Sequence, residues 1–222
     1  MMQHLALIMD GNRRWAKKRM MMPWLGHRQG AQVVEMVIEY CLHQSIPYLS
    51  LYTFSLENLQ RMPQEINYLF DLIEESALRH EEFVKNNVKV RFVGDMSQLP
   101  EKTRRICLQL SEKTEHCTAL VCNFLICYGA QQEIVSAVQK MVQEGFKPQS
   151  VQDIKPYLWL GNIPDPELII RTGGVGRLSN FLLYQAAYSE IRFLDCLWPD
   201  LTRDVLDQVV SQSSAVQKNF GV

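Results

Sequence analysis

The chain has 222 residues, with 23 Lys and Arg against 24 Asp and Glu and a formal net charge of −1. Hydrophobic residues account for 47% and charged residues for 21%, ordinary globular values that exclude a disordered or collagen-like chain. The balanced charge argues against a nucleic-acid-binding protein, because such proteins usually carry a basic excess that meets phosphate.

No run of residues approaches the roughly 20 apolar positions that a transmembrane helix needs. The first residues pass straight into a strand-like segment, without the basic region and small-residue cleavage site of a secretory signal. The six cysteines form no C-x-x-C pair and mostly lie in apolar segments, which favours buried thiols in a reducing compartment over a structural zinc site. We therefore expect a cytoplasmic protein.

Short apolar runs alternate with stretches of helical periodicity along the whole chain. The apolar runs predict strands at residues 4–9, 48–54, 88–93, 119–126, 168–170 and 191–193. Apolar residues at helical spacing predict helices around residues 34–41 and over residues 64–85, 100–113, 132–142 and 201–217. This order is typical of a single α/β domain, here residues 1–222, with a mostly parallel sheet flanked by helices. Ligands of such sheets bind beyond the carboxyl ends of the strands.

The first predicted strand runs into the sequence DGNRR at residues 10–14. Gly11 permits a tight turn, Asp10 is a candidate ligand for a divalent cation, and the amides of the following helix start suit a diphosphate together with Arg14. An ordinary surface Asp-Gly turn before a solvated basic helix explains the same residues about equally well. Farther on, His27 is either a phosphate donor or a helix-start residue with no ligand.

Polar side chains also follow the second predicted strand. Ser55, Asn58 and Arg61 are placed to bind or orient a polar ligand, although Ser and Asn also serve as helix caps. Glu65 falls in the first turn of the next predicted helix, where the helix dipole alone favours a carboxylate.

The fifth predicted strand ends in the strongest of these motifs. Arg171 closes the strand, two glycines form a turn, and Arg177 and Ser179 precede a helix that we predict to begin near Asn180. Two guanidinium groups, a hydroxyl and glycine-exposed amides at one place predict a phosphate clamp, since paired arginines match phosphate geometry.

Together the three strand ends favour a magnesium-dependent enzyme that handles diphosphates over a binding module. The predicted helix over residues 64–85 carries more apolar side chains than one narrow stripe needs. Ordinary core packing explains this, and the functional alternative is the wall of a tunnel for a long hydrocarbon.

At these residues the chain resembles the cis-prenyltransferase family, most closely its bacterial undecaprenyl diphosphate synthases. The resemblance runs nearly end to end, and the DDxxD motif of trans-prenyl synthases is absent. The segments that carry it are HLALIMDGNRRWA, GHRQGA, LSLYTFSLEN, VRFVGD, IIRTGG-x-x-R-x-SNFLLYQ, AYSEIRF and LWPD.

The resemblance implies an α/β homodimer with an apolar tunnel between the sheet and the long helices. It implies repeated condensation of isopentenyl diphosphate onto farnesyl diphosphate, with formation of cis double bonds. The product is a polyprenyl diphosphate, which we expect to be near undecaprenyl length. This product serves as a lipid carrier precursor for peptidoglycan and the cell wall. It implies Asp10 and Asn58 as catalytic residues and a Mg²⁺ site at Asp10 and Glu190. The substrate-binding residues that it implies are Gly11, Asn12, Arg13, Arg14, Trp15, His27, Ser55, Leu56, Glu57, Leu59, Arg61, Arg171, Arg177, Leu178 and Ser179.

A neutral amide has negligible basicity, so we expect Asn58 to orient the substrate while a diphosphate oxygen receives the proton. The chain departs from the family pattern at Pro23, Leu59, Glu167, residues 127–131 and residues 175–176. Leu120 is expected near the floor of the tunnel.

Two alternatives stay open. A non-catalytic subunit of a heteromeric complex typically loses the aspartate of the first turn, which is intact here. An enzyme that binds nucleotide phosphates is the other, and it would bind ATP tightly and give no prenyl product. Release of a lipid product also implies transient association with a membrane through the apolar rim of the tunnel.

Overall fold

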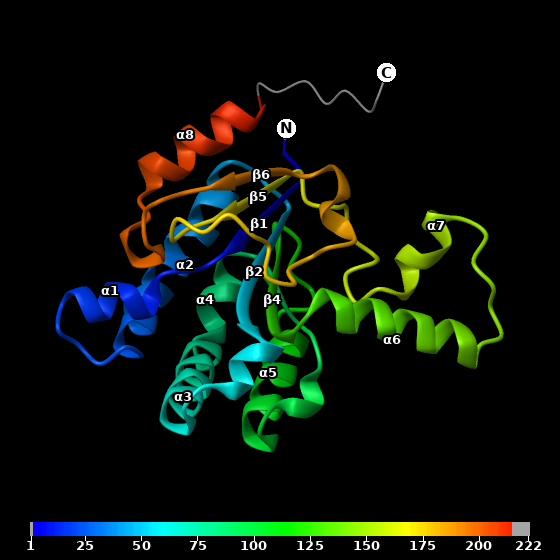
Figure 1. Cartoon of the computed structure of the whole chain (residues 1–222), viewed down its shortest axis with the longest axis horizontal. Coiled ribbons are helices and arrows are strands. Elements are labelled where there is room, and N and C mark those ends of the chain that lie inside the picture. Colours follow the sequence, from blue (N-terminus) through cyan, green and yellow to red (C-terminus); the bar gives the residue numbers. More distant parts are fainter. Residues whose placement is uncertain (1, 215–222) are drawn as a thin grey trace.

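The computed structural model describes residues 2–214, in which strands and helices alternate along the chain (Figure 1). The strands are β1 His4–Ile8, β2 Tyr48–Ser55, β3 Val88–Val93, β4 Leu120–Tyr128, β5 Leu168–Arg171 and β6 Glu190–Phe193. The α-helices are α1 Asn12–Lys18, α2 Leu25–His43, α3 Pro63–Leu78, α4 His80–Lys85, α5 Glu101–Lys113, α6 Ala130–Gln143, α7 Val151–Ile154 and α8 Arg203–Ser214. Short 3₁₀ helices include η1 Leu56–Gln60 and η4 Gln185–Tyr188.

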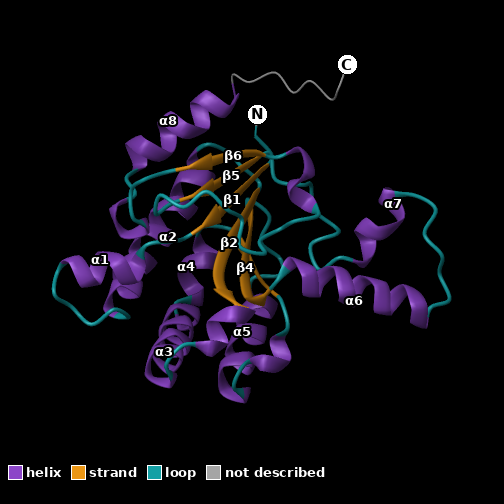
Figure 2. Cartoon of the chain, viewed as in Figure 1, coloured by secondary structure: helices purple, strands orange, loops and turns teal. Residues whose placement is uncertain are grey.

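The six strands form one sheet in the order β3-β4-β2-β1-β5-β6, and each neighbouring pair is parallel. Figure 2 shows the strands in the centre with helices on either side. The predicted parallel α/β fold is confirmed. Because β1 pairs with both β2 and β5, the segments that follow these three strands emerge at the same edge of the sheet.

Alternation along β1 divides its side chains between two cores. Leu5 and Leu7 pack with apolar residues of α2, α5 and α8, whereas Ala6 and Ile8 pack on the other side with residues such as Leu160. All five residues of β1 are buried, as expected for a central strand covered on both faces.

Three predicted helices differ from the structure. The helix over residues 64–85 is divided into α3 and α4 at Arg79, whose N–H donates to Ser76 O while its own carbonyl accepts from Glu82 N. No α-helix begins near Asn180 in the described part of the chain. Ser179, Asn180 and Leu182 there have positive φ angles, and only η4 follows. The last helix begins at Arg203, and its predicted end at residue 217 lies outside the described residues.

The thiols agree with the prediction of buried cysteines. All six cysteines are free, five are buried, and Cys196 is partly buried. Burial raises the pKa of the Cys41 and Cys107 thiols to about 12, so both stay protonated and unreactive at neutral pH. Among residues 2–214, none of the helices has the length and apolar character needed to cross a membrane.

His4, the first residue of β1, is buried and is held in its neutral form. Its Nδ1 lies 2.7 Å from Pro164 O and its Nε2 lies 2.8 Å from Ser50 Oγ. A carbonyl can only accept, so Nδ1 carries the proton and Nε2 accepts from the serine hydroxyl. Burial lowers the pKa of His4 to about 4, from the ordinary value of 6.5.

This geometry predicts a pH-dependent stability. Since the unfolded chain binds more protons than the folded one between these two pKa values, the contribution of His4 is complete above pH 6.5 and is lost as the pH falls toward 4. We expect the free energy of unfolding to drop by about 2 kcal/mol between pH 7 and pH 5 through this group. Urea denaturation at both pH values measures it. His4→Gln should lower stability at pH 7 and flatten the pH dependence, and an unaltered pH dependence would contradict the assignment.

Candidate active site

Asp10 lies two residues beyond the end of β1, and two guanidinium groups hold its carboxylate. Its Oδ2 accepts a hydrogen bond from Arg171 Nη2 at 2.9 Å, and its Oδ1 lies 3.2 Å from Arg14 Nη2. Thr172 Oγ1 and the N–H of Trp198 donate to the Asp10 carbonyl oxygen at 2.7 and 3.0 Å. The Asp10 side chain remains 31% exposed, so the carboxylate is fixed in place and still accessible to a ligand.

Two glycines allow this close approach. Gly11 has a φ of 120°, and a Cβ there would lie 2.9 Å from Leu197 Cα. Gly173 has a φ of 92°, and a Cβ there would lie 2.3 Å from Arg14 Nη2, whose neighbouring Nη1 donates to Gly173 O at 2.7 Å. Both positions therefore require glycine, for backbone conformation and for space.

Arg171 is the most buried cation of the site, at 5% exposure. Besides Asp10, its guanidinium donates through Nη1 to Ser179 Oγ at 2.8 Å and to the carbonyl oxygen of Arg177. Within residues 2–214 its buried Nε has no hydrogen-bond partner. Arg177 contributes its carbonyl to this contact, and its side chain is exposed, so the convergence of two guanidinium groups on one phosphate stays a prediction.

A second cluster of cations surrounds Glu65 at the start of α3. Glu65 is only 2% exposed, and its carboxylate lies 3.0 Å from Arg61 Nη1, 3.5 Å from Arg13 Nε and 3.6 Å from His27 Nε2. The His27 imidazole, followed by the guanidinium groups of Arg61 and Arg13, lowers the pKa of the Glu65 carboxyl despite its burial. Burial lowers the pKa of His27, so its ring is neutral at neutral pH.

Sequence reasoning missed the role of Glu65, which we explained by the helix dipole alone. The only local signal is Arg61 four residues before it, since Arg13 and His27 reach the carboxylate from distant parts of the chain. Glu65 is the residue that assembles three of the predicted substrate-binding side chains.

The segment after β2 is shaped by a capping box. The Ser55 and Asn58 side chains each bond to the other's backbone at the start of η1, and Asn58 Oδ1 accepts from Ser55 N at 3.3 Å. The amide of Asn58 is thus oriented by its own turn. Glu57 accepts a hydrogen bond from Asn180 Nδ2 at 3.2 Å, which ties this segment to the one after β5.

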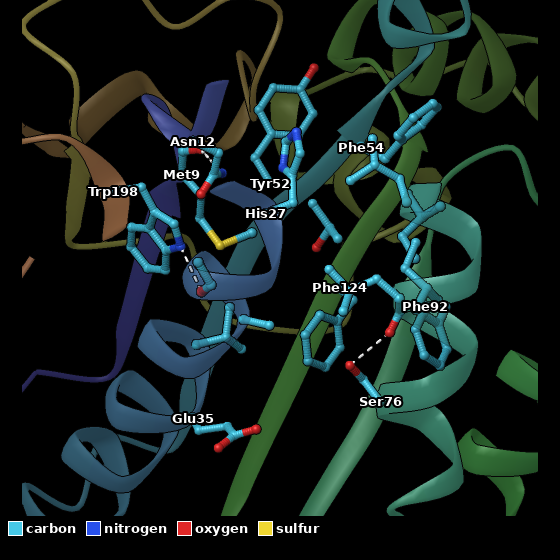
Figure 3. A pocket seen from close by; sticks show the side chains of 18 of the residues that line it. Met9, Asn12, His27, Glu35, Tyr52, Phe54, Ser76, Phe92, Phe124 and Trp198 are labelled. Carbon is cyan, nitrogen blue, oxygen red and sulfur yellow. Dashed lines mark hydrogen bonds between the residues drawn. The ribbon is translucent and has the colours of Figure 1, made fainter. Parts of the chain in front are cut away.

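A cavity of about 800 Å³ opens at this edge and runs between the sheet and the helices α2, α3 and α4. Its volume is in the upper part of the usual range for ligand sites, roughly 300–1,000 Å³. Figure 3 shows Met9, Asn12 and His27 at one end and Glu35 at the other, with Phe92 and Phe124 along the wall. Apolar residues of the predicted tunnel helix line it, namely Leu69, Leu72, Ile73 and Phe83.

An adjoining cleft of about 430 Å³, which we call the mouth cleft, carries the cationic residues. It is lined by Gly11, Arg13, Arg14, Lys17 and Pro23, and it shares Met9, Asp10, Asn12, His27 and Arg61 with the larger cavity. A cationic cleft therefore continues directly into an apolar one.

Several predicted residues lie elsewhere. Leu56 and Leu59 pack against a core cluster with Phe54 and Phe70, and Leu178 packs against another with Phe181. Trp15 donates through Nε1 to Asp200 Oδ1 at 2.7 Å and is covered by the Arg19 guanidinium. None of these four predicted residues lines the cavity or the mouth cleft, as described within residues 2–214.

The predicted tunnel floor is also corrected. Leu120 is fully buried in the main core and does not line the cavity within the described chain. Val88, which pairs with it across β3 and β4, lines the deep end instead.

The predicted metal pair of Asp10 and Glu190 does not form within one chain. Glu190 begins β6, level with Leu168, whereas Asp10 lies beyond Ile8, which is level with Arg171. Three residues of strand separate these levels, roughly 10 Å at 3.3 Å per residue. The Glu190 carboxylate pairs with Arg192 instead.

Cations fixed at the edge of a parallel sheet, continuous with a deep apolar cavity, define an α/β protein built for an anionic head with an apolar tail. The family model of undecaprenyl diphosphate synthases matches residues 8–221. The chain belongs to this family of prenyltransferases.

Known proteins are similar to this chain over nearly its whole length. A ditrans,polycis-undecaprenyl-diphosphate synthase of Micrococcus luteus, described as specific for (2E,6E)-farnesyl diphosphate, is 40% identical over 99% of this chain and 91% of its own. The crystal structure of a probable undecaprenyl diphosphate synthase from Campylobacter jejuni has a TM-score of 0.85 and 34% identity, covering 100% of this chain and 99% of that one. Lavandulyl diphosphate synthase from Lavandula x intermedia, in complex with dimethylallyl diphosphate, has a TM-score of 0.94 at 26% identity, covering 100% and 98%.

Proposed function

We propose that the protein condenses isopentenyl diphosphate repeatedly onto an allylic diphosphate, farnesyl diphosphate, and makes a cis-polyprenyl diphosphate near undecaprenyl length. The observation that carries this proposal is the continuity of the cationic mouth cleft with the apolar cavity of about 800 Å³. A diphosphate suits the cleft and a hydrocarbon tail suits the cavity. The name of the Micrococcus luteus relative supports farnesyl diphosphate as the starter.

In each condensation the allylic C–O bond breaks, the terminal alkene carbon of isopentenyl diphosphate forms a new C–C bond to the allylic carbon, and the proton that isopentenyl diphosphate loses passes to a diphosphate oxygen. The departing diphosphate gains negative charge, so fixed cations beside it stabilise the transition state. Arg13, Arg14 and His27 bind the allylic diphosphate together with the N–H groups at the start of α1. Arg171 and Ser179 bind isopentenyl diphosphate, and Asn58, whose amide is fixed by its turn, orients it.

Mg²⁺ fits the chemistry of Asp10, because magnesium in such sites is held by one or two carboxylates with substrate phosphates and water. When bound, it would neutralise charge on the leaving diphosphate. Asp10 is the one carboxylate that the proposal assigns to it. Arg14 and Arg171, which pair with Asp10, lie beside this carboxylate, where they would also contact the phosphates.

The product would serve as a precursor of the lipid carrier for peptidoglycan synthesis, made in the cytoplasm by a homodimer. Val135, Val138 and Val142 support an interface between copies, since they lie on one side of α6 and are each at least half exposed.

One experiment distinguishes the proposed enzyme from the two alternatives, a non-catalytic subunit and an enzyme that binds nucleotide phosphates. The purified protein is incubated with farnesyl diphosphate, radiolabelled isopentenyl diphosphate and Mg²⁺. The proposal predicts an extended lipid product from this chain alone. Absence of product at high protein concentration would favour the non-catalytic subunit, and tight ATP binding without product would favour the nucleotide enzyme.

Transient membrane association is part of the proposal, because the product is a lipid. Met20, Met21 and Met22 follow α1 and are 98%, 40% and 54% exposed, next to the basic residues Lys17 and Lys18. Exposed apolar side chains beside cations suit an anionic bilayer surface.

We expect the protein to float with anionic vesicles and to do so less when Met20→Ser is introduced. Leu108→Ser, at an exposed apolar position on α5, is the matched control and should leave flotation unchanged. Equal flotation of both variants and the wild type would remove the methionine segment from the proposal.

A further inference from the structure

Asn180 follows Ser179 in the loop after β5 and lines the cavity, but it binds no substrate group in the proposed reaction. Its backbone carbonyl accepts a hydrogen bond from Ala130 N at 2.8 Å, and its side-chain Oδ1 accepts one from Gln131 N at 2.9 Å. These N–H groups belong to the first turn of α6, where Gly129 has no side chain to cap the helix. Asn180 therefore caps α6 from a segment that lies 49 residues farther along the chain.

The amide nitrogen of the same side chain reaches the segment after β2. Asn180 Nδ2 donates to Glu57 Oε1 at 3.2 Å and to Gln132 Oε1 at 3.1 Å. Gly129 leaves the space for this contact, since a Cβ there would lie 2.6 Å from Asn180 Nδ2. One amide group thus joins three segments, which follow β2, β4 and β5.

These contacts join the direct neighbours of two residues that are proposed to hold isopentenyl diphosphate. Asn58 follows Glu57 in η1. Ser179 precedes Asn180, and its Oγ accepts from Arg171 Nη1 at 2.8 Å. The bond between their two neighbours therefore limits how far Asn58 can move from Ser179. Such limits matter for a reaction, because a displacement of roughly 1 Å can cost about 100-fold in rate.

The loop that carries Ser179 depends on contacts with other segments, because its backbone has an unfavourable conformation. Ser179, Asn180 and Leu182 have φ angles of 51°, 63° and 44°. Residues other than glycine rarely adopt a left-handed backbone, although asparagine tolerates it better than most, and they keep it where the surrounding contacts hold them. Tyr52 supplies a further contact, since its hydroxyl donates to Ser179 O at 3.3 Å. The position of Ser179 is thus imposed from outside its own loop.

We propose that Asn180 is a positioning residue for prenyl transfer, which holds Ser179 in register with Asn58 by joining the first turn of α6 to Glu57. This inference rests on the proposed function for the identity of the ligand, isopentenyl diphosphate. Within residues 2–214, Asn180 does not line the mouth cleft, where the allylic diphosphate is proposed to bind. Its loss should therefore weaken the binding of isopentenyl diphosphate and spare that of the allylic substrate.

Asn180→Gly tests this, because it removes the side chain and keeps a residue that suits the positive φ. The allylic site is first filled with farnesyl thiodiphosphate, an analogue that reacts slowly, in the presence of Mg²⁺. Isopentenyl diphosphate is then titrated into this complex, and binding is measured by calorimetry. We expect the affinity for isopentenyl diphosphate to fall about tenfold and that for farnesyl thiodiphosphate to change by less than about twofold, as for lost hydrogen bonds that act on one site.

Asn87→Gly is the matched control, because Asn87 has the same local geometry outside the site. Its φ is 54°, its carbonyl accepts from Ala119 N at 3.0 Å, and its Oδ1 accepts from Thr118 N at 2.8 Å. In the described part of the chain, none of these three residues lines the cavity or the mouth cleft. Both glycine variants should lower the urea midpoint by similar amounts, and only Asn180→Gly should lose affinity for isopentenyl diphosphate. An equal loss of affinity in both variants would leave Asn180 a purely structural residue and overturn the proposal.

A double-mutant cycle isolates the contact with Glu57. Asn180→Asp keeps the acceptor for Gln131 N but replaces the donor to Glu57 with a second carboxylate. We expect this change to weaken isopentenyl diphosphate binding about tenfold in the wild type and less than about twofold in the Glu57→Gln background, where the glutamine amide can donate to the new carboxylate. Equal losses in the two backgrounds would contradict a link through Glu57.

Failure of the proposed function gives a different result from failure of this inference. A wild type that binds both diphosphates and makes no product contradicts the proposed function, and the affinities of the variants still decide the role of Asn180. A wild type that binds no isopentenyl diphosphate, with the allylic site filled, overturns the role of Asn180 as well.

Discussion

Asp10→Asn is expected to lower kcat for prenyl transfer about 100- to 1,000-fold, the usual cost of removing one group that stabilises developing charge. The substitution keeps the size of the side chain but removes the charge that the proposal assigns to Mg²⁺. It also removes the anion that pairs with Arg14 and Arg171. Steady-state rates with farnesyl diphosphate and radiolabelled isopentenyl diphosphate measure the effect.

The fold should survive this change, because Asp10 is partly exposed and its carbonyl contacts with Thr172 and Trp198 do not depend on the side chain. Asp71→Asn is the matched control, since Asp71 lies exposed on α3 outside the cavity. Similar rates for Asp10→Asn and Asp71→Asn would contradict the role proposed for Asp10.

Arg171→Lys is expected to lower kcat/KM for isopentenyl diphosphate about 10- to 100-fold, the range for a lost hydrogen bond to a charged group. Lysine keeps the positive charge but cannot contact Asp10 and Ser179 at once as the planar guanidinium does. The KM for isopentenyl diphosphate should change more than the KM for farnesyl diphosphate.

Arg105→Lys, on the exposed face of α5, controls for a general effect of the replacement. A loss that falls instead on the farnesyl diphosphate KM would place Arg171 in the allylic site and contradict the division of roles proposed above.

The sequence was sufficient to predict the sheet and the edge of the sheet at which Asp10, Ser55 and Arg171 lie. Strand ends are marked by short apolar runs that stop at Asp10, Ser55 and Arg171, and the rule that parallel strands share a carboxyl edge brings these residues together. Such predictions succeed because they depend on local pattern and on topology.

The parts that sequence reasoning missed depend on contacts between distant segments. Glu65 gains its role from Arg13 and His27, which only the folded chain brings to it. The helical pattern over residues 64–85 continues across Arg79, so the break there leaves no clear periodic signal.

The predicted metal pair shows the limit of resemblance. Glu190 matches a family motif, but the register of β5 and β6 places it at the amino end of its strand, away from Asp10. The motif therefore identifies Glu190 in the sequence, but the distance between Glu190 and Asp10 depends on the strand register in the folded chain.

We propose that the allylic diphosphate binds in the mouth cleft beside Asp10 and Arg14 while its tail extends into the cavity toward Glu35. A crystal structure of the protein soaked with farnesyl thiodiphosphate, a slowly reacting analogue, and Mg²⁺ tests this most directly. We expect phosphate density at the mouth cleft beside Asp10 and continuous tail density between α2 and α3. Analogue density outside the cavity, or a diphosphate bound away from Asp10, would contradict it.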